Sequence, residues 1–168
     1  VATGGGFLDG RLAGVLRPCF SYLVALRQAG GQDSPNYFTF GFSHDWSVSG
    51  GHLRVSGEDH YSALKRPRYK ARCRSLAEWG WSRYPQLPRD EDYPARYGVY
   101  SETPDLMPLV GPAEGAPRVC YMVGCNAWGQ ASLSAAAALA PVLLGYRRPT
   151  PREARTAALF SIRRFTGP

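Results

Sequence analysis

The chain has 168 residues, of which 44% are hydrophobic and 20% are charged, a composition typical of a globular domain rather than a disordered or fibrous chain. No run of about 18 apolar residues occurs, so the sequence predicts no membrane-spanning helix. The formal net charge of +7 favours anionic partners but does not discriminate between folds.

The first residues are Val1-Ala2-Thr3-Gly4, without an initiator methionine or an export signal. We therefore expect the chain to be a piece of a longer protein. Residues 1–3 are typical of a strand end, and the glycines at 4–6 predict a sharp turn that lets the backbone approach another group.

The first half of the chain predicts an antiparallel sheet. Residues 17–26 are mostly apolar and aromatic, as expected of a buried strand, and residues 37–42 are rich in β-formers. Residues 46–48 and 52–55 flank a serine and two glycines, which is a hairpin signal.

A helix is predicted between Pro67, which suits a first helical turn, and Pro85, which ends it. Basic residues lie on both sides of its apolar stripe, and they have two interpretations. They are either the solvated face of an ordinary helix or a surface that grips nucleic-acid phosphate. The six residues are Lys65, Arg66, Arg68, Lys70, Arg72 and Arg74.

The second half predicts a turn, a strand, a glycine-flanked turn and a buried helix. The first turn is within residues 103–111, residues 119–123 form a strand, and residues 124–129 lead into a helix over 131–144 that ends at Gly145. A further strand is expected at 97–100. Pro141 should kink or end the helix, because proline lacks the N–H that would bond to the Ala137 carbonyl.

The four cysteines lack the spacing of a zinc site, and the three histidines lie apart from them. The sequence therefore predicts no metal site. We expect free thiols in a reducing compartment, either the cytoplasm or the mitochondrial matrix.

Several segments in a fixed order carry a family resemblance. They are Tyr100 to Asp105 with Pro108 and Gly111, the turn at 124–129, and the closing residues 159–165; residues 1–4 and 53–59 match more weakly. Together they resemble the C-terminal half of the flavin-dependent amine and amino-acid oxidoreductases, the D-amino-acid oxidase superfamily that includes glycine oxidase, sarcosine oxidase and dimethylglycine dehydrogenase. The likeness spans nearly the whole chain.

The resemblance implies an α+β chain, an incomplete two-domain FAD-oxidoreductase fold that lacks its N-terminal dinucleotide-binding βαβ unit. Residues 1–12 and 103–168 would belong to the α/β flavin domain, and residues 13–102 would form an antiparallel-sheet substrate domain with one helix near 67–84. The implied activity is oxidation of a C–N bond in an amine or amino acid by hydride transfer to FAD, provided that the missing N-terminal half is present.

The resemblance also implies a site at the start of the last helix, where unpaired N–H groups would stabilise negative charge on a reduced flavin. Tyr100, Asn126 and Trp128 are the catalytic candidates. Their alternative roles are a solvent-facing tyrosine, a turn asparagine with a left-handed backbone, and a core tryptophan. The glycine turn could equally serve only to pack a helix on a sheet. The candidates for contact with the cofactor are Thr3, Gly4, Pro104, Asp105, Gly124, Gly129, Gln130, Ala131 and Ser132.

Three departures from the family pattern bear on activity. No Gly-x-Gly-x-x-Gly motif occurs, so the phosphate-binding residues are absent. Tyr100 stands where glycine-oxidase-like members have a carboxylate-binding arginine. Gly98 and Ala131 stand where sarcosine-oxidase-like members have a flavin-linked cysteine and a carboxylate-binding lysine. The alternative is therefore an inactive flavoprotein-derived scaffold, bound to another protein chain or contacting nucleic acid through its basic helix.

Overall fold

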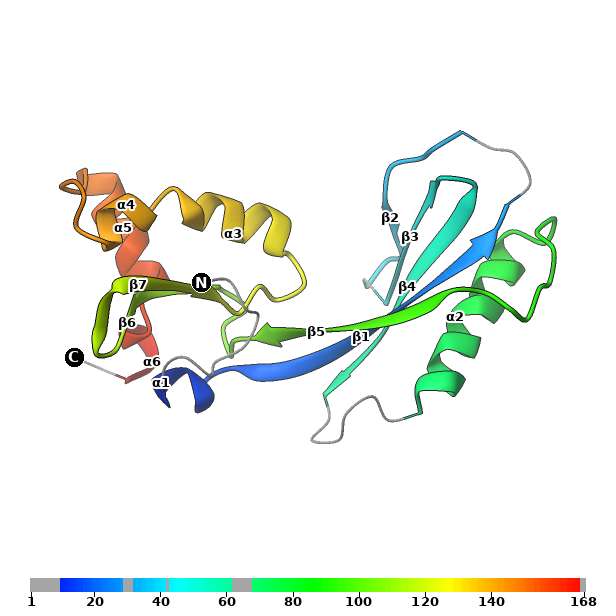
Figure 1. The fold of residues 1–168 in the computed structure, drawn as a ribbon, viewed down its shortest axis with the longest axis horizontal. Coiled ribbons are helices and arrows are strands. Elements are labelled where there is room, and N and C mark those ends of the chain that lie inside the picture. The colour runs from blue at the N-terminus through cyan, green and yellow to red at the C-terminus, as the bar shows by residue number, and fades with distance from the viewer. Residues whose placement is uncertain (1–9, 29–31, 42, 62–67, 167–168) are drawn as a thin grey trace. The chain divides into compact units, whose positions relative to one another are not determined.

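The computed structural model describes residues 10–28, 32–41, 43–61 and 68–166. The chain forms two compact units: unit 1 comprises Val1–Pro18 and Tyr100–Pro168, and unit 2 comprises Cys19–Val99. Figure 1 shows the elements of both units in chain order. Thr3, Gly4, the glycine turn at 4–6 and Pro67 lie outside the described residues, so the predictions made for them stay predictions.

Unit 2 is built on a five-stranded sheet of order β2-β3-β4-β1-β5. Its strands are β1 (Arg17–Arg27), β2 (Tyr37–Phe38), β3 (His44–Ser49), β4 (His52–Tyr61) and β5 (Ala95–Glu102). The pairs β1–β4, β2–β3 and β3–β4 are antiparallel. Gly50 and Gly51 both have positive φ, the backbone that a two-residue hairpin turn requires, which confirms the predicted hairpin.

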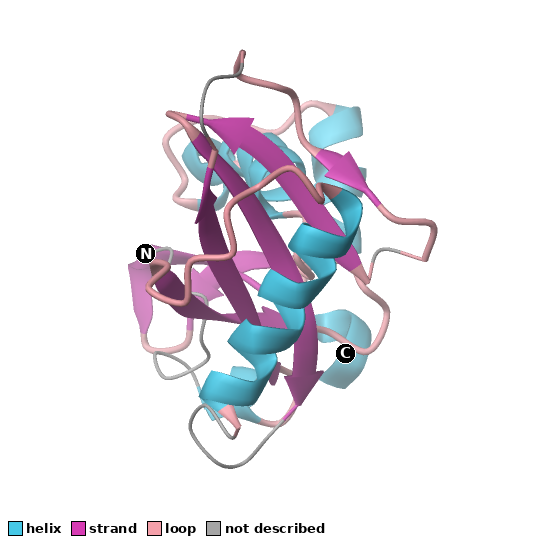
Figure 2. Ribbon diagram, turned by 90° about the vertical axis from the view of Figure 1, so that its right-hand side faces the viewer, coloured by secondary structure: helices cyan, strands magenta, loops and turns pink. Residues whose placement is uncertain are grey.

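Helix α2 (Tyr69–Arg83) covers one face of this sheet, as Figure 2 shows. Alternate residues of the strands point at the helix because strand side chains alternate between the two faces. Phe20, Tyr22, Val24 and Leu26 of β1 are buried in this way, and Leu76 of α2 is among the side chains that meet them. Unit 2 therefore has one continuous hydrophobic core.

Unit 1 contains a two-stranded antiparallel sheet, β6 (Leu109–Ala113) and β7 (Ala116–Val123). Its helices are α1 (Gly10–Ala13), α3 (Gly129–Ala137), α4 (Ala140–Leu143), α5 (Pro151–Phe160) and α6 (Arg163–Thr166). Two small clusters of buried residues replace a single core, one around Leu12, Leu109 and Tyr121 and one around Val110, Cys120 and Ala136.

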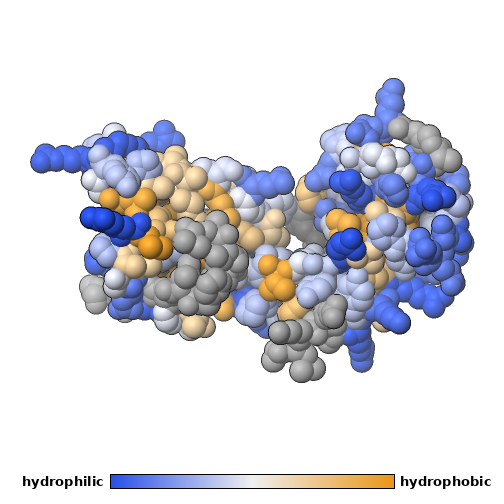
Figure 3. Space-filling view, in the orientation of Figure 1, coloured by the Kyte–Doolittle hydropathy of each residue, from blue (hydrophilic) through white to orange (hydrophobic). Residues whose placement is uncertain are grey.

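The single buried helix predicted over 131–144 is wrong in two respects. It begins at Gly129 and breaks after Ala137, and Pro141 lies in the first turn of a separate α4, where its missing N–H costs no helical hydrogen bond. Ala136 is the only buried residue of α3. The apolar surface over α3 and α4 is visible in Figure 3. In the described part of the chain, nothing covers the outer face of this alanine-rich helix.

Other predictions hold or need smaller correction. The strand predicted at 37–42 is confined to β2, which ends at Phe38, while Phe40 is fully exposed. The chain is an α+β protein with antiparallel sheets, as predicted. Among the described residues, no helix is long and apolar enough to cross a membrane.

Candidate functional site

The turn at residues 103–106 is held by the side chain of Thr103, which is 3% exposed. The Leu106 N–H donates to the Thr103 carbonyl over 3.1 Å and closes the turn. The Thr103 Oγ1 donates to the Met107 carbonyl over 2.8 Å. Leu106 has φ +57, a left-handed backbone that is unfavourable for a residue with a Cβ. A buried hydroxyl thus fixes a turn that is strained at its last residue.

Asp105, in the same turn, is bound by Arg164 of α6. The Arg164 Nε lies 2.6 Å from Oδ2 and the Arg164 Nη2 3.1 Å from Oδ1, a two-pronged contact. The guanidinium also donates to the Met107 carbonyl. The hydrogen bond from Arg164 lowers the pKa of Asp105, and the Met107 N–H contributes in the same direction. Pro104 and Asp105 are both exposed residues, but the carboxylate is occupied by the chain's own arginine.

Asn126 joins this turn to the turn that precedes α3. Its Oδ1 accepts from the Thr103 N–H over 2.8 Å, and its Nδ2 donates to the Gly124 carbonyl over 2.6 Å. Its own N–H donates to the Ser101 carbonyl. Asn126 is 5% exposed, so these bonds satisfy a buried amide that would otherwise be costly. Asn126 therefore connects the two predicted turns, and we call its hydrogen bonds to Thr103, Gly124 and Ser101 the Asn126 bracket.

The backbone before α3 is left-handed at several positions. Asn126 has φ +52, Ala127 φ +64 and Gly124 φ +69. Asparagine tolerates this conformation, but an alanine there costs about 1 kcal/mol. A Cβ on Gly124 would lie 2.8 Å from the Thr103 Cγ2 and 3.2 Å from the Leu16 Cδ2. The close approach predicted for Gly124 is thus made to the chain's own side chains.

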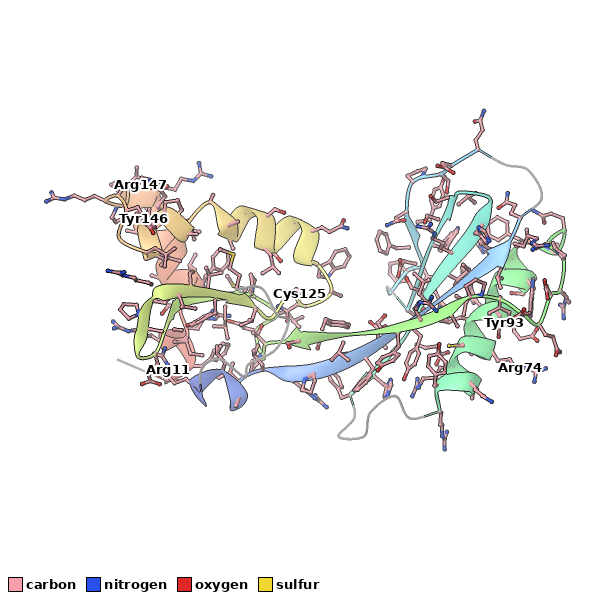
Figure 4. All side chains as sticks on the ribbon, viewed as in Figure 1. Arg11, Arg74, Tyr93, Cys125, Tyr146 and Arg147 are labelled. Carbon is pink, nitrogen blue, oxygen red and sulfur yellow. The ribbon has the colours of Figure 1, made fainter. Side chains whose placement is uncertain are left out.

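The start of α3 offers fewer donors than predicted. The N–H groups of Ala131 and Ser132 both donate to the Trp128 carbonyl, so the prediction that they are unpaired is wrong. Among the described residues, the N–H groups of Gly129 and Gln130 have no hydrogen-bond partner. A Cβ on Gly129 would lie 3.0 Å from the Cys125 Cβ, and Figure 4 places Cys125 in the turn just before α3.

Tyr100 precedes the turn at residues 103–106, and Trp128 follows Asn126 just before α3. Tyr100 is half-buried, and its hydroxyl donates to Glu102 Oε1 over 3.2 Å. Trp128 is 49% exposed, so the alternative of a core tryptophan is wrong. Asn126 does have the left-handed backbone of a turn asparagine. Its hydrogen bonds give it a structural role, and the catalytic role stays a prediction.

Two residues that organise the site were not among the predicted site residues. Thr103 was part of the motif without a role, and Arg164 lay in the closing segment that carried the resemblance. Arg164 contacts Asp105 across 59 positions of sequence. No periodicity or spacing rule connects residues so far apart, and only the alignment of the closing segment with the family could have drawn attention to it.

Two N–H groups at the start of α3, those of Gly129 and Gln130, have no partner among the described residues and could donate to a negatively charged group such as the edge of a flavin ring. By contrast, no glycine motif for the phosphates occurs in the sequence. Across the described ranges, no group of three or more His, Cys, Asp or Glu residues could hold a metal ion.

The basic residues near α2 do not form a uniform phosphate-binding face. Arg72 is half-buried and binds Glu58, with 3.1 Å between its Nη1 and the Glu58 Oε2. Arg68, Lys70 and Arg74 are exposed, while Lys65 and Arg66 lie outside the described residues. Arg72, one of the six basic residues, is thus paired with the Glu58 carboxylate of the same chain. Nucleic-acid binding stays a prediction.

Comparison with known proteins gives structural neighbours only. No protein-family model matches the chain, and no curated protein matches its sequence. An iminodiacetate oxidase from Chelativorans sp. BNC1 is similar with a TM-score of 0.60 and 18% identity, over 88% of this chain and 40% of that one. An L-amino acid deaminase from Proteus vulgaris, lacking its specific insertion sequence, is similar with a TM-score of 0.59 and 15% identity, over 90% of this chain and 37% of that one. The chain has part of the fold of these proteins and spans less than half the length of either.

Proposed function

We propose that this chain is the C-terminal part of a FAD-dependent oxidoreductase that oxidises a C–N bond of an amine or amino acid. Two proteins named for reactions of such compounds share its fold over most of its length. The ordered motifs of the sequence support the same family. The full protein would include an N-terminal dinucleotide-binding unit that supplies the phosphate contacts.

The observation that carries the proposal is the bracket made by Asn126. It ties the turn at Thr103 to the turn before α3, and Leu106, Asn126 and Ala127 are all left-handed in these turns. Strained backbone is retained where the surrounding structure over-determines it, and such positions cluster at functional sites. Both turns belong to the motifs that resemble the flavoenzyme family.

The roles of the chain's own residues follow from their chemistry. A bound flavin would accept the hydride from the carbon next to nitrogen. The N–H groups of Gly129 and Gln130 are available to stabilise negative charge at the start of α3. Tyr100 and Trp128 would orient the substrate and exclude water. Asn126 would act by positioning, because its amide is already occupied.

The substrate contacts would differ from those of the best-known members. Tyr100 donates a neutral hydrogen bond where an arginine would supply a charged pair, and Ala131 replaces a lysine. A substrate carboxylate would therefore find no charged partner at these two positions. We expect a substrate whose affinity does not depend on a carboxylate contact there.

The test is to express the protein with its natural upstream sequence and record the visible absorbance of bound flavin. We expect a flavin spectrum that bleaches when a suitable amine or amino acid is added without oxygen. Asn126→Ala should weaken flavin retention, whereas Asn36→Ala, at an exposed position, should not. A folded full-length protein without bound flavin would contradict the proposal of an enzyme and would favour the alternative of an inactive scaffold.

The exposed face of α3 is the observation that favours the scaffold alternative. Ala131, Ala135 and Ala137 are exposed on a helix whose composition suits burial. Another protein chain, or the N-terminal half of the same protein, would cover this face. In the scaffold alternative that contact is the function, and it would persist without flavin.

A further inference from the structure

Unit 2 contains a cavity of about 290 Å³ between α2 and the segment that leads into β5. This volume is at the small end of the range for small-molecule sites, which suits a ligand of amino-acid size. Figure 4 labels two of its lining residues near each other, Arg74 from α2 and Tyr93 from the segment before β5. The cavity does not involve the residues of the Asn126 bracket, which all lie in unit 1.

Aromatic side chains form the walls of the cavity. Trp81 is 5% exposed, and its ring meets that of Tyr93 edge to face at 5.9 Å. The Trp81 Nε1 donates to the Pro88 carbonyl, so the indole presents only apolar surface inward. Tyr69 and Cys73 complete this lining. Such walls favour a flat, apolar side chain.

Charges of both signs line the same cavity and are separated along it. Lys70, Arg74 and Glu78 follow one another at four-residue spacing on one side of α2, and Glu91 lies on the opposite wall. The cations thus belong to the first half of the helix and Glu78 to its second half. A simple anion would meet two carboxylates here, and a simple cation would meet two basic groups.

These charges are available to a ligand. Within the described ranges, Lys70, Arg74 and Glu91 have no ion-pair partner, although Arg74 and Glu78 have the spacing of a helical pair. Glu78 lies 3.6 Å from Arg89, and both side chains are largely exposed. Burial raises the pKa of Tyr93. The positive charge of Arg74 lowers this pKa, and the negative charges of Glu78 and Glu91 raise it further. Tyr93 thus lies within electrostatic reach of charges of both signs that line the cavity.

We propose that this cavity binds a small zwitterion with an aromatic side chain, its carboxylate toward Lys70 and Arg74 and its ammonium toward Glu78 and Glu91. Each charge of the ligand then meets the opposite charge, and the ring lies against Trp81 and Tyr93. The site is separate from the proposed flavin reaction and does not rest on it. It would serve to sense or retain an amino acid rather than to transform it.

The experiment titrates L-phenylalanine into the protein expressed with its natural upstream sequence and follows amide and indole N–H chemical shifts. We expect saturable shifts at Cys73, Tyr93 and the Trp81 indole. Phenylalanine amide, which lacks the carboxylate, and N-acetylphenylalanine, which lacks the ammonium, should each bind about two- to fivefold more weakly, since half-exposed charge pairs contribute that much.

Matched variants assign each charge to its partner. Arg74→Gln should weaken phenylalanine and N-acetylphenylalanine but leave the affinity of the amide unchanged, and Glu91→Gln should weaken phenylalanine and the amide but leave the N-acetyl compound unchanged. Arg54→Gln, at an exposed position of β4 outside the cavity, should change nothing. Lys70→Gln replaces Arg74→Gln if the latter alters the spectrum of the free protein.

Three results would overturn the proposal. The first is the absence of saturable shifts at millimolar phenylalanine. The second is equal affinity for all three ligands, which would make the cavity merely apolar. The third is a loss of affinity in Arg54→Gln as large as in Arg74→Gln.

Discussion

Helix α2 of unit 2 and helix α3 of unit 1 differ in how much of each is covered. Five of the residues of α2 are buried against the sheet, whereas α3 buries only Ala136. The more apolar helix is therefore the less covered one. Unit 2 completes its own core from residues 19–99, while unit 1 has an apolar helix above two strands. Within the described residues, unit 1 therefore leaves more apolar helix surface exposed than unit 2 does.

The largest expected effect contrasts one leucine from each helix. Leu76→Ala in α2 should reduce the free energy of unfolding by about 2–5 kcal/mol, because Leu76 is fully buried and leaves a cavity. Leu133→Ala in α3, at a half-buried position, should cost less than about 1.5 kcal/mol. Urea unfolding combined with hydrogen exchange in each helix measures both. Equal losses would remove the distinction between the two helices.

The second prediction concerns the bracket in unit 1. Asn126→Ala should cost about 2 kcal/mol, because it leaves the Thr103 N–H and the Gly124 carbonyl buried without their partner. Hydrogen exchange at the Thr103 amide should accelerate accordingly. Asn36→Ala is the control, and it should leave this amide unchanged. Unaltered protection of Thr103 in Asn126→Ala would show that the bracket does not hold the turn.

The third prediction concerns the pair of Asp105 and Arg164. Arg164→Gln should cost about 1 kcal/mol at pH 7, a modest value because the Asp105 side chain is 35% exposed. The pKa of Asp105 is lowered in the folded chain, so the stabilisation is present above the unfolded-state pKa of about 3.9 and is lost as the pH falls through the folded value. The difference between wild type and variant should therefore shrink in acid to the part contributed by the hydrogen bond from Arg164 to the Met107 carbonyl. An undiminished difference in acid would show that the charge pair with Asp105 contributes nothing.

The smallest expected effect lies at the start of α5. Thr150 and Glu153 form a capping box, and Arg147 binds the same carboxylate, which lowers the pKa of Glu153 to about 2. The stabilisation is present above the unfolded-state pKa and is lost between that value and about 2. In Arg147→Gln the Glu153 titration, followed by carbon chemical shift, should move upward. The surface position of the pair predicts little change in stability, and a large change would mean that α5 depends on this cap.

The two units also differ in how well their sequences predict them. In unit 2 the strand β1, the hairpin at Gly50 and Gly51 and the helix α2 each follow from local patterns of apolar residues and turn glycines. The strand predicted at 37–42 is an exception, because β2 is an edge strand and pairs only at Tyr37 and Phe38. Local propensity for strand does not reveal where a partner strand ends.

In unit 1 the two turns of the candidate site were predicted, but the hydrogen bonds that hold them were not. The motifs predicted the turns at Thr103 and Gly124 as separate elements along the chain. They did not indicate that Asn126 would connect these turns or that Arg164 would bind the Asp105 carboxylate. Nor did they indicate that the Trp128 carbonyl would accept hydrogen bonds from the N–H groups of Ala131 and Ser132. These contacts join residues that are distant in sequence or depend on backbone dihedral angles, and neither leaves a periodic signal.

The sequence by itself determined the hairpin, the helix before Pro85 and the two turns of the candidate site, because each depends on residues close together in the chain. The α+β class followed from the family resemblance. Only the tertiary structure decided that Asn126 and Arg164 hold those turns, that α3 and α4 are separate helices, and that α3 is uncovered within the described chain. Burial and long-range hydrogen bonds depend on which segments meet in space. A local sequence pattern predicts which secondary structure a segment forms, but it does not predict which other segments will pack against it.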